Sequence, residues 1–471
     1  MSSSGDQPHP GDLSEEDVKR CLKVLQTLAQ RPELCDSSVP GIAAVRDHAA
    51  RLLRASRQQQ RTECRQRDRD LLDATGIRNA DLKSSPDQEA APTHLATLTR
   101  ARHCYVCKRP YDQVHPFYDC LCPACGDFNY AKRLQSADLT GRVALITGGR
   151  VKIGFQTALK LLRAGASVVV TTRFRCDAAR RFAQQDDFSA WSDRLQIHAL
   201  DMRFLPLVEQ FAAHLASELA RLDVVINNAA QTVRRPPAYY RHLLEGEGAN
   251  AEPLPSGTQQ LLAPAPSAQI ATLPSAALLT QLALLPEDES SLAHFPPGWY
   301  DSAGQQVDLR PRNSWDLQLS EVAPVELIEV HAVNCLAPFM LLRHLEPLLF
   351  RADGVSKYVV NVSGTEGQLS TATKSSRHPH TNMAKAALNM ITRTCAENYA
   401  QHGVFMNSVD TGWISNEGPD PTRVRMAAEG FREPLDAIEA AARVLDPVFL
   451  GVLTGRNEYG KFWKDYRPVA W

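Results

Sequence analysis

Four cysteines have the type and spacing for metal chemistry. They form two Cys-x-x-Cys pairs separated by fourteen residues: Cys104, Cys107, Cys122 and Cys125. Each pair can wrap around one ion, and four thiolates complete the closed tetrahedral shell of a structural zinc site. His115 and Cys120 lie between the pairs and could substitute as ligands, although the symmetry of the pairs favours leaving them out. We therefore expect structural Zn²⁺ in a zinc-ribbon-like module at 100–132.

A strand–helix–strand unit is predicted over residues 141–173. The apolar run 143–146 indicates a buried parallel strand, and Gly148 and Gly149 end it with a tight turn. Apolar residues then recur at helical spacing from Ile153, and the valines at 168–170 indicate the next buried strand. Such a unit brings backbone N–H groups and the positive end of a helix dipole to a place where a pyrophosphate can bind. The pattern predicts a dinucleotide-binding Rossmann unit.

Further short motifs accompany this unit along residues 138–471. They are the turn Thr147-Gly-Gly-Arg-Val-Lys-Ile-Gly154, then Asp201, Asn227-Asn-Ala-Ala230, Asn334 and Lys385. In this combination the chain resembles the short-chain dehydrogenase/reductase family. The resemblance implies an α/β fold with a doubly wound parallel sheet, and Asn334 and Lys385 in the active site. It also implies a set of cofactor-binding residues: Thr147, Gly148, Gly149, Arg150, Lys152, Ile153, Gly154, Arg173, Asp201, Asn228, Ala229, Lys385 and Gly412.

The charges around the glycine turn favour NADP(H) over NAD(H). An NAD site usually carries Asp or Glu at the end of the second strand, whereas an arginine there accommodates a 2′-phosphate. Here Arg173 stands at that end, and Arg150 and Lys152 lie in the turn. Lys152 replaces the middle glycine of the family motif, which looks like the version found in pteridine-reductase-like members that use NADPH.

The predicted active site departs from the family pattern. Typical members have a proton-transferring Tyr four residues before the Lys, where this chain has Thr381, and a catalytic Ser where it has Gly364. A threonine hydroxyl is far too weak an acid to replace a phenol near neutral pH. His378 stands seven residues before Lys385, as the catalytic Tyr does in the enoyl-acyl carrier protein reductases, and histidine titrates near neutrality.

We hypothesise that His378 or, as the second choice, His380 serves as the general acid. Ser363 or Thr365 would then orient the substrate. The alternative interpretation is that both histidines belong to a mobile loop over the cofactor.

The composition is typical of a globular protein, and its positive and negative charges nearly cancel. The chain has 52 basic and 53 acidic residues among 471, which excludes a global attraction to nucleic acid or membranes. No apolar run reaches transmembrane length, and the polar N-terminus lacks the apolar region of a secretory signal. Eleven cysteines, an odd number, make a disulfide framework a poor interpretation. We expect a cytoplasmic protein.

The sequence predicts three regions. Residues 1–95 are expected to be helical and partly disordered, with a capped helix start at Ser14, a second helix from about 41 to 74 and a linker at 80–95. The zinc-ribbon-like module and the Rossmann domain follow. The arginines of the second helix fall roughly on one face, which indicates either a solvated surface or a site for an acidic partner.

The Rossmann domain is expected to carry an insertion at about 245–305 that is rich in Pro, Ala and Leu. We expect its middle to be disordered or a loose helical excursion. Its charged and aromatic flanks offer candidates for a substrate lid, with packing against the sheet edge as the alternative: Arg234, Arg235, Tyr239, Tyr240 and Trp315.

These predictions together favour an NADP-dependent oxidoreductase that transfers hydride to or from a small-molecule carbonyl, imine or enoyl substrate. The alternative is a dinucleotide-binding scaffold or sensor without catalysis, whose zinc ribbon and Arg-rich helix bind a partner. By family habit, the helices around 326–350 and 383–399 are expected to form a homo-oligomer interface.

Overall fold

The protein is described from a computed structural model. The structure describes residues 14–36, 41–79, 96–248, 252–263, 275–289, 292–352, 354–371 and 374–471. The predicted linker at 80–95 lies outside the described residues, as do 249–251, 264–274 and 290–291 of the predicted insertion.

The elements before the large sheet are few. They are α1 (Glu15–Gln30), α2 (Ile42–Asp73), α3 (Gly76–Asn79), β1 (Ala96–His103), β2 (Pro110–Val114) and α4 (Pro123–Leu134). Strands and helices then alternate: β3 (Val143–Thr147), α5 (Lys152–Arg163), β4 (Ser167–Thr172), α6 (Arg175–Ala183), β5 (Leu195–Ala199), α7 (Leu205–Glu218), β6 (Val224–Asn227), α8 (Arg241–Glu245), α9 (Pro324–His331), a π-helical turn (Ala332–Leu336), α10 (Ala337–Leu349), β7 (Lys357–Ser363), α11 (Pro379–Gln401), β8 (Val404–Asp410), α12 (Asp420–Ala428), α13 (Ala437–Thr454), β9 (Phe462–Lys464) and β10 (Arg467–Val469).

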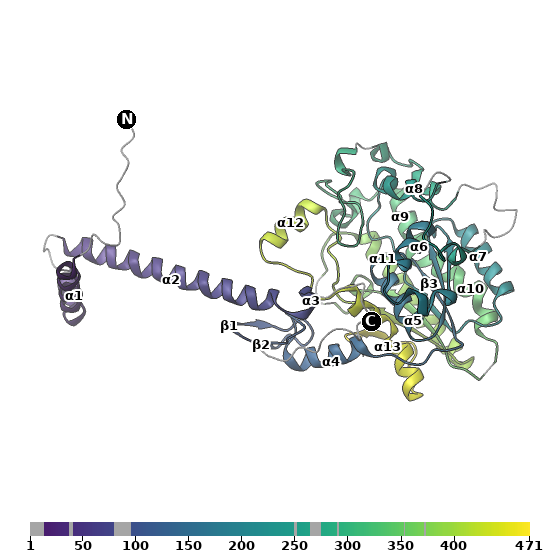
Figure 1. Ribbon diagram of the computed structural model, residues 1–471, viewed down its shortest axis with the longest axis horizontal. Coiled ribbons are helices and arrows are strands. Elements are labelled where there is room, and N and C mark those ends of the chain that lie inside the picture. Colours follow the sequence, from purple (N-terminus) through teal and green to yellow (C-terminus); the bar gives the residue numbers. More distant parts are fainter. Residues whose placement is uncertain are drawn as a thin grey trace. The chain divides into compact units, whose positions relative to one another are not determined.

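An eight-stranded sheet forms the centre of the fold (Figure 1). Its strand order is β10-β9-β8-β7-β6-β3-β4-β5, and every pairing is parallel except that of β9 with β10. The chain winds outward from β3 to β5, then returns to β6 on the other side of β3. The carboxyl ends of β3 and β6 therefore form the switch point at which ligands bind in such sheets. The predicted doubly wound fold is confirmed.

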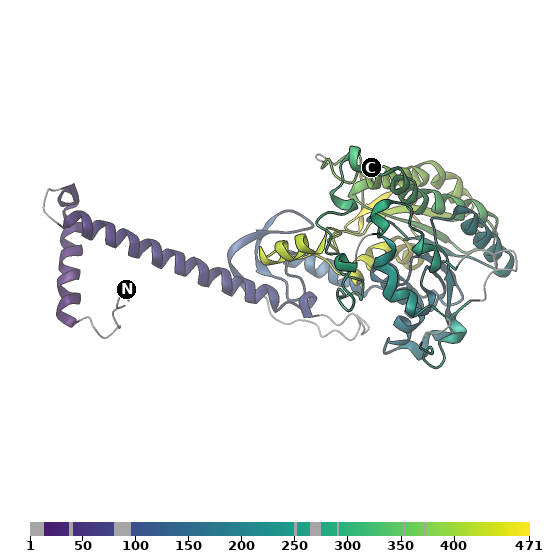
Figure 2. The same ribbon diagram turned by 90° about the horizontal axis from the view of Figure 1, so that it is seen from above.

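Helices cover both faces of this sheet (Figures 1 and 2). One core packs α5, α6 and α13 against the sheet, and a second core packs α7, α10 and α11 against the opposite face. The span Pro324–Leu349 is long and apolar enough to cross a membrane by length and composition. Its most apolar 18-residue window is 61% buried inside the protein. The expectation that no apolar run reaches transmembrane length is thus wrong for this span.

The helices α1 and α2, with residues 98–100, form a separate unit from the rest of the chain. Ser14 caps α1, because its hydroxyl accepts from the N–H of Asp17 while the Asp17 carboxylate accepts from the N–H of Ser14. Neither helix has a buried residue. The helix bounds agree with the sequence patterns.

The module that carries the four cysteines consists of the β1–β2 hairpin and α4. Its helix packs against α13 through polar contacts that are largely buried. Arg133 donates to Asp436 at 2.8 Å, and Arg443 donates to Asn129 at 2.7 Å. The Tyr118 hydroxyl donates to the Glu439 carboxylate. The module is thus fixed to the Rossmann fold on the side of α13.

The described parts of the insertion are folded against the sheet. They form short 3₁₀-helices: Gln259–Leu261, Leu278–Gln281, Pro286–Glu289 and Leu292–His294. Phe295 and Ala277 pack with Phe174, Tyr239 and Tyr240 in a small buried cluster. Aromatic burial and the ion pair of Asp288 with Arg234 hold these short helical turns in place. Residues 264–274, in the middle of the insertion, lie outside the described residues, so the expectation for them stays a prediction.

Candidate functional site

The turn between β3 and α5 is locked to the end of β6. The Thr147 hydroxyl accepts from the N–H groups of Asn228 and Ala229, at 3.0 and 2.9 Å. The Asn228 amide donates to the carbonyls of Thr147 and Gly148, at 2.9 and 3.2 Å. Gly148 has φ +70°, and a Cβ on Gly154 would lie 2.2 Å from the Gly148 oxygen. The close approach of these backbones therefore requires glycine at both positions.

This turn opens into a cleft of about 350 Å³. Helix α5 begins there at Lys152, and its N-cap Val151 has no side chain that could accept from the first-turn N–H groups. Those donors need a partner from outside the helix, and an anion such as a pyrophosphate satisfies them. Ile153 lines the same cleft.

Four arginines line the cleft: Arg150, Arg173, Arg203 and Arg235. The first two have different kinds of partner. Arg150 donates to the Asp177 carboxylate at 2.6 Å and to Gln305 at 2.9 Å. Arg173 donates to the Tyr240 hydroxyl at 3.1 Å, and its guanidinium lies 4.6 Å from the centre of that ring. Within the described part of the chain, no carboxylate lies within ion-pair distance of Arg173. Its positive charge is therefore available to an anionic ligand.

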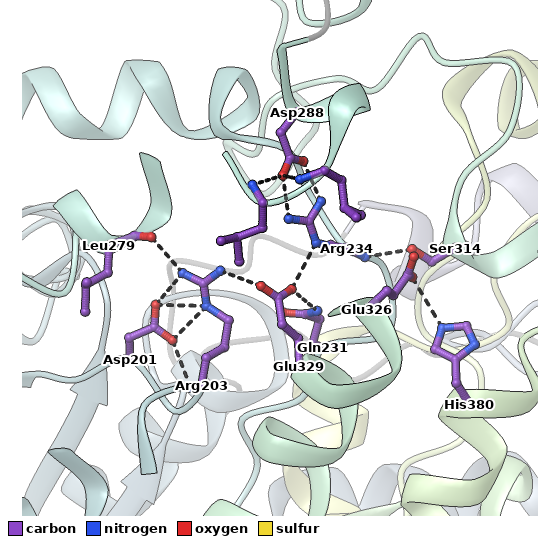
Figure 3. Close-up of polar contacts among 12 residues, drawn as sticks. Asp201, Arg203, Gln231, Arg234, Leu279, Asp288, Ser314, Glu326, Glu329 and His380 are labelled. Carbon is purple, nitrogen blue, oxygen red and sulfur yellow. Dashed lines mark hydrogen bonds and ion pairs between the residues drawn. The ribbon is translucent and has the colours of Figure 1, made fainter. Parts of the chain in front are cut away.

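A buried polar network borders the cleft (Figure 3). Asp201 lines the cleft, and both its oxygens accept from the Arg203 guanidinium, the shortest contact being 2.7 Å. Arg203 also donates to Glu329 of α9 at 3.1 Å. Glu329 in turn accepts from Arg234 at 3.1 Å, and Arg234 reaches Asp288 of the insertion. The network ties the end of β5 to α9 and to the insertion.

Glu417 also lines the cleft. The nearby Lys152 ammonium, 3.7 Å away, lowers the pKa of the Glu417 carboxyl to about 2. The Ser415 hydroxyl donates to the same carboxylate at 2.7 Å. Glu417 therefore remains charged across the whole neutral range.

A second cavity of about 460 Å³ adjoins the cleft and shares Ile153 and Asn228 with it. Lys385 of α11, Ser363 at the end of β7 and Thr381 line this cavity. The oxygens Ser363 Oγ and Thr381 Oγ1 are buried and have no hydrogen-bond partner in the described protein. Buried hydroxyls without partners are costly, so both are suited to binding a ligand.

Lys385 is the buried cation of this cavity. Its ammonium donates to the carbonyl of Val362 at 2.8 Å, which directs the side chain toward the end of β7. Burial lowers the pKa of Lys385 to about 8. A lysine with this pKa can both hold and release a proton near neutral pH.

Asn334 lies in the π-helical turn between α9 and α10 and is fully buried. Its amide oxygen accepts from the N–H of Gln231 at 2.7 Å, and its amide nitrogen donates to the Gln231 carbonyl at 3.1 Å. π-Helical turns of this kind are frequent at functional sites. The residue holds the chain after β6 in place and is not among the residues that line the second cavity.

The two histidines lie behind the cavity wall. The His378 ring stacks on Trp315, with ring centres 4.0 Å apart, and Trp315 rather than His378 lines the cavity. Burial lowers the pKa of His378, whose Nδ1 has no partner among the described residues. His380 is buried, with Nε2 3.3 Å from the Glu326 carboxylate.

The loop after β8 contacts a residue of the cysteine module at the wall of the cavity. Gly412, at φ +78°, leaves no room for a Cβ, which would lie 2.6 Å from Leu435. The next residue, Trp413, donates its N–H to the hydroxyl of Tyr105 at 2.9 Å, and both side chains line the cavity. Sequence reasoning missed Tyr105. The only feature in the sequence that could have drawn attention to Tyr105 is its position between two candidate metal ligands. That position does not indicate the direction of the Tyr105 side chain.

The four cysteines come together in the module that carries Tyr105. The Sγ atoms of Cys104, Cys107, Cys122 and Cys125 all lie within 4.8 Å of one another, and those of Cys107 and Cys122 are 3.8 Å apart. Zn–S bonds of about 2.3 Å in a tetrahedron give an S–S separation of about 3.8 Å, so the cluster fits the ion.

The two other candidate ligands have different partners. Cys120 donates to the Pro434 carbonyl at 3.1 Å. His115 Nδ1 accepts from the N–H groups of Phe117 and Tyr118, at 3.0 and 3.2 Å.

Two family models match this chain. The model described as short chain dehydrogenase matches residues 142–241, and the one described as enoyl-(acyl carrier protein) reductase matches 313–442.

Among curated relatives, the uncharacterized protein R665 of Acanthamoeba polyphaga mimivirus is 30% identical over 386 residues, which is 78% of this chain and 75% of the relative. Human retinol dehydrogenase 13 is 32% identical over 97 residues, 20% of this chain and 28% of that relative. The family models and this relative are those of oxidoreductases, so the alternative of a non-catalytic scaffold is not favoured.

Among solved structures, the NADPH-bound carbonyl reductase from chicken fatty liver is 18% identical and has a TM-score of 0.43. The match covers 71% of this chain and all of that one.

Proposed function

Since the chain belongs to the short-chain dehydrogenase/reductase family, we propose that it is an NADP(H)-dependent oxidoreductase acting on a small-molecule carbonyl, imine or enoyl compound. One observation carries the proposal. A cavity with two unpartnered buried hydroxyls and the Lys385 ammonium adjoins the cleft formed by the glycine turn.

The choice of NADP(H) depends on Arg173. The backbone donors between Gly148 and Gly154 would bind the pyrophosphate, and Arg173, which lacks a carboxylate partner in the described chain, would bind a 2′-phosphate. Asp201 would contact the adenine side of the cleft. When bound, the nicotinamide supplies or accepts the hydride.

We assign the role of proton donor to Lys385. In the reducing direction, a substrate oxygen or nitrogen would accept hydrogen bonds from Ser363 and Thr381 and a proton from Lys385 Nζ. A pKa of about 8 leaves most of this lysine protonated at neutral pH, and it makes the ammonium a better acid than an ordinary lysine. Asn334 acts as a positioning residue through Gln231.

His378 is the second candidate for proton donor. It is supported by its unpartnered buried Nδ1 and by its stacking on Trp315, a residue of the cavity wall.

The metal site forms part of the same proposal. The four cysteines would hold one Zn²⁺, which has a structural role because all four coordination positions are filled by protein. Thiolate ligands must stay reduced, which fits a cytoplasmic location.

The experiment is a screen of NADPH oxidation with aldehydes, ketones, cyclic imines and enoyl thioesters, together with NADPH and NADH affinities from nucleotide fluorescence. We expect preferential NADPH binding and turnover of one class. Tight binding without any turnover would contradict the enzymatic proposal.

Single-turnover hydride transfer in Lys385→Met, His378→Gln and His380→Gln identifies the donor. We expect a loss of about 100-fold or more for Lys385→Met and little change for the two histidine variants.

A further inference from the structure

The loop of the cysteine cluster reaches into the substrate cavity. Tyr105 lies directly between the ligand positions Cys104 and Cys107, and its side chain lines the same cavity as Lys385 and Ser363. The cavity wall is therefore built in part by residues that precede the Rossmann fold in the sequence.

Hydrogen bonds hold Tyr105 at its main chain and at its hydroxyl. Its main-chain N–H donates to the carbonyl of Cys120 at 2.9 Å, inside the module. Its hydroxyl accepts from the N–H of Trp413 at 2.9 Å, and it lies 3.4 Å from the place that a Cβ on Gly412 would occupy. The phenol thus connects the cysteine cluster to the loop that follows β8.

The Tyr105 hydroxyl has an unused hydrogen-bond donor. It accepts one hydrogen bond, from Trp413, and among the described residues no acceptor lies within hydrogen-bond range of its own proton. A phenol can donate and accept at once. The proton of Tyr105 is therefore available to a group bound in the cavity.

The cavity wall is also aromatic. Tyr105, Trp315 and Trp413 all line it, and they come from the cysteine module, the segment before α9 and the loop after β8. The Trp315 and Trp413 rings are supported by His378 and Phe431, with ring centres 4.0 and 4.7 Å away. Aromatic side chains held in this way offer flat surfaces to a planar ligand.

The module has little core of its own to hold Tyr105. Its buried apolar cluster consists of a few residues: Ile77, Cys104, Tyr111, Phe117, Tyr118 and Leu121. Small modules with so little core usually depend on a metal or a disulfide for their order. We therefore expect the position of Tyr105 to depend on the state of the four cysteines.

We propose that Tyr105 is a substrate-positioning residue whose hydroxyl donates a hydrogen bond to an aromatic or conjugated carbonyl compound. The metal cluster holds Tyr105 in place and thereby sets the affinity for this substrate. The proposal rests on the proposed function. The cluster then serves substrate binding and leaves dinucleotide binding unaffected, because neither Tyr105 nor the four cysteines line the dinucleotide cleft.

The test compares Tyr105→Phe with Tyr111→Phe. Tyr111 belongs to the same module, but its hydroxyl donates to the Asp119 carbonyl at 2.8 Å and does not line the cavity. Phenanthrenequinone, a planar aromatic dicarbonyl, is the probe substrate. We expect Tyr105→Phe to raise KM roughly three- to tenfold, the effect of one net hydrogen bond, with kcat within about twofold and NADPH affinity unchanged. Tyr111→Phe should change none of these.

Two readouts do not need turnover. Hydrogen exchange of the Trp413 amide should be faster in Tyr105→Phe and after metal removal by a chelator, because this N–H loses its acceptor, and it should be unchanged in Tyr111→Phe. Quinone binding, followed by quenching of tryptophan fluorescence, should weaken in parallel.

Unchanged exchange and unchanged quinone affinity in Tyr105→Phe would overturn the proposal. Failure of the wild-type protein to oxidise NADPH with any substrate, while these two readouts respond, would instead overturn the proposed function.

Discussion

Arg234 and Asp288 form a bidentate ion pair, with nitrogen–oxygen distances of 2.5 and 2.7 Å. Asp288 also accepts from the N–H groups of Leu284 and Leu285, and Arg234 donates to Glu329 of α9 (Figure 3). The Asp288 carboxylate therefore stabilises the turn that begins at Leu284. It also attaches the insertion to the Rossmann fold beside the cleft.

Replacing Asp288 by Ala should destabilise the protein strongly. Without Asp288, Arg234 keeps Glu329 as a charged partner but loses two hydrogen bonds, and the N–H groups of Leu284 and Leu285 lose their acceptor. A hydrogen bond to a charged group contributes about 1.5–3 kcal/mol, so we expect a loss of this order. Urea unfolding measures the loss. The control is Glu321→Gln, which breaks the exposed pair with Arg312 and should leave the unfolding midpoint unchanged. An equal effect of the two substitutions would contradict this role of Asp288.

Replacing Arg173 by Ala should weaken NADPH binding by roughly 10- to 100-fold, because a charge-assisted hydrogen bond contributes about 1.5–3 kcal/mol. NADH affinity should change little, since NADH has no 2′-phosphate. Fluorescence titration with both nucleotides measures the two affinities. Arg175→Ala is the matched control, because Arg175 donates to the Ala263 carbonyl and does not line the cleft. Equal losses for NADPH and NADH would argue against a 2′-phosphate site at Arg173.

Lys385 should make stability depend on pH in the alkaline range. Its pKa is about 8 in the folded protein and about 10.5 when unfolded, so the unfolded state binds more protons between these values. Below pH 8 burial of the ammonium costs about 3 kcal/mol, and this cost disappears as pH rises toward 10.5. The free energy of unfolding of the wild type, measured relative to Lys385→Met, should therefore increase with pH in this window. A constant difference between the two proteins would mean that the lysine has an ordinary pKa.

The four cysteines should bind one zinc ion per chain. Native mass spectrometry gives the stoichiometry, and a thiol reagent should release one equivalent. Cys125→Ser should abolish binding, whereas Cys120→Ser should retain it, because the Cys120 thiol donates to Pro434 and lies outside the cluster. A metal-free protein with an intact module would contradict the site.

The helices α9 to α11 should form a homo-oligomer interface. They expose several large apolar side chains: Leu327, Ile328, Leu336, Phe339, Met383 and Met390. Exposed apolar groups of this size favour association. Light scattering after size exclusion should show an oligomer that Ile328→Glu with Phe339→Glu converts to monomers. Leu453→Glu, on α13, changes a comparably exposed leucine and should not dissociate it.

Sequence alone predicted the elements whose signals are local. The strand β3, the glycine turn and helix α5 are encoded by neighbouring residues, since the period of apolar positions and the conformational freedom of glycine act over a few positions. The candidate metal cluster was predicted for the same reason, because each Cys-x-x-Cys pair is a local arrangement. Lys385 and Asn334 were predicted as active-site residues from the family motifs.

Tertiary structure alone decided what surrounds these groups. Trp413 lies 308 positions after Tyr105, and Asp288 lies 54 after Arg234, so no local pattern links either pair. The pKa of Lys385 near 8 and the unpartnered hydroxyls of Ser363 and Thr381 are likewise products of burial. Burial and hydrogen bonding between distant segments depend on how the whole chain packs, whereas the glycine turn and the cysteine pairs need only their immediate neighbours.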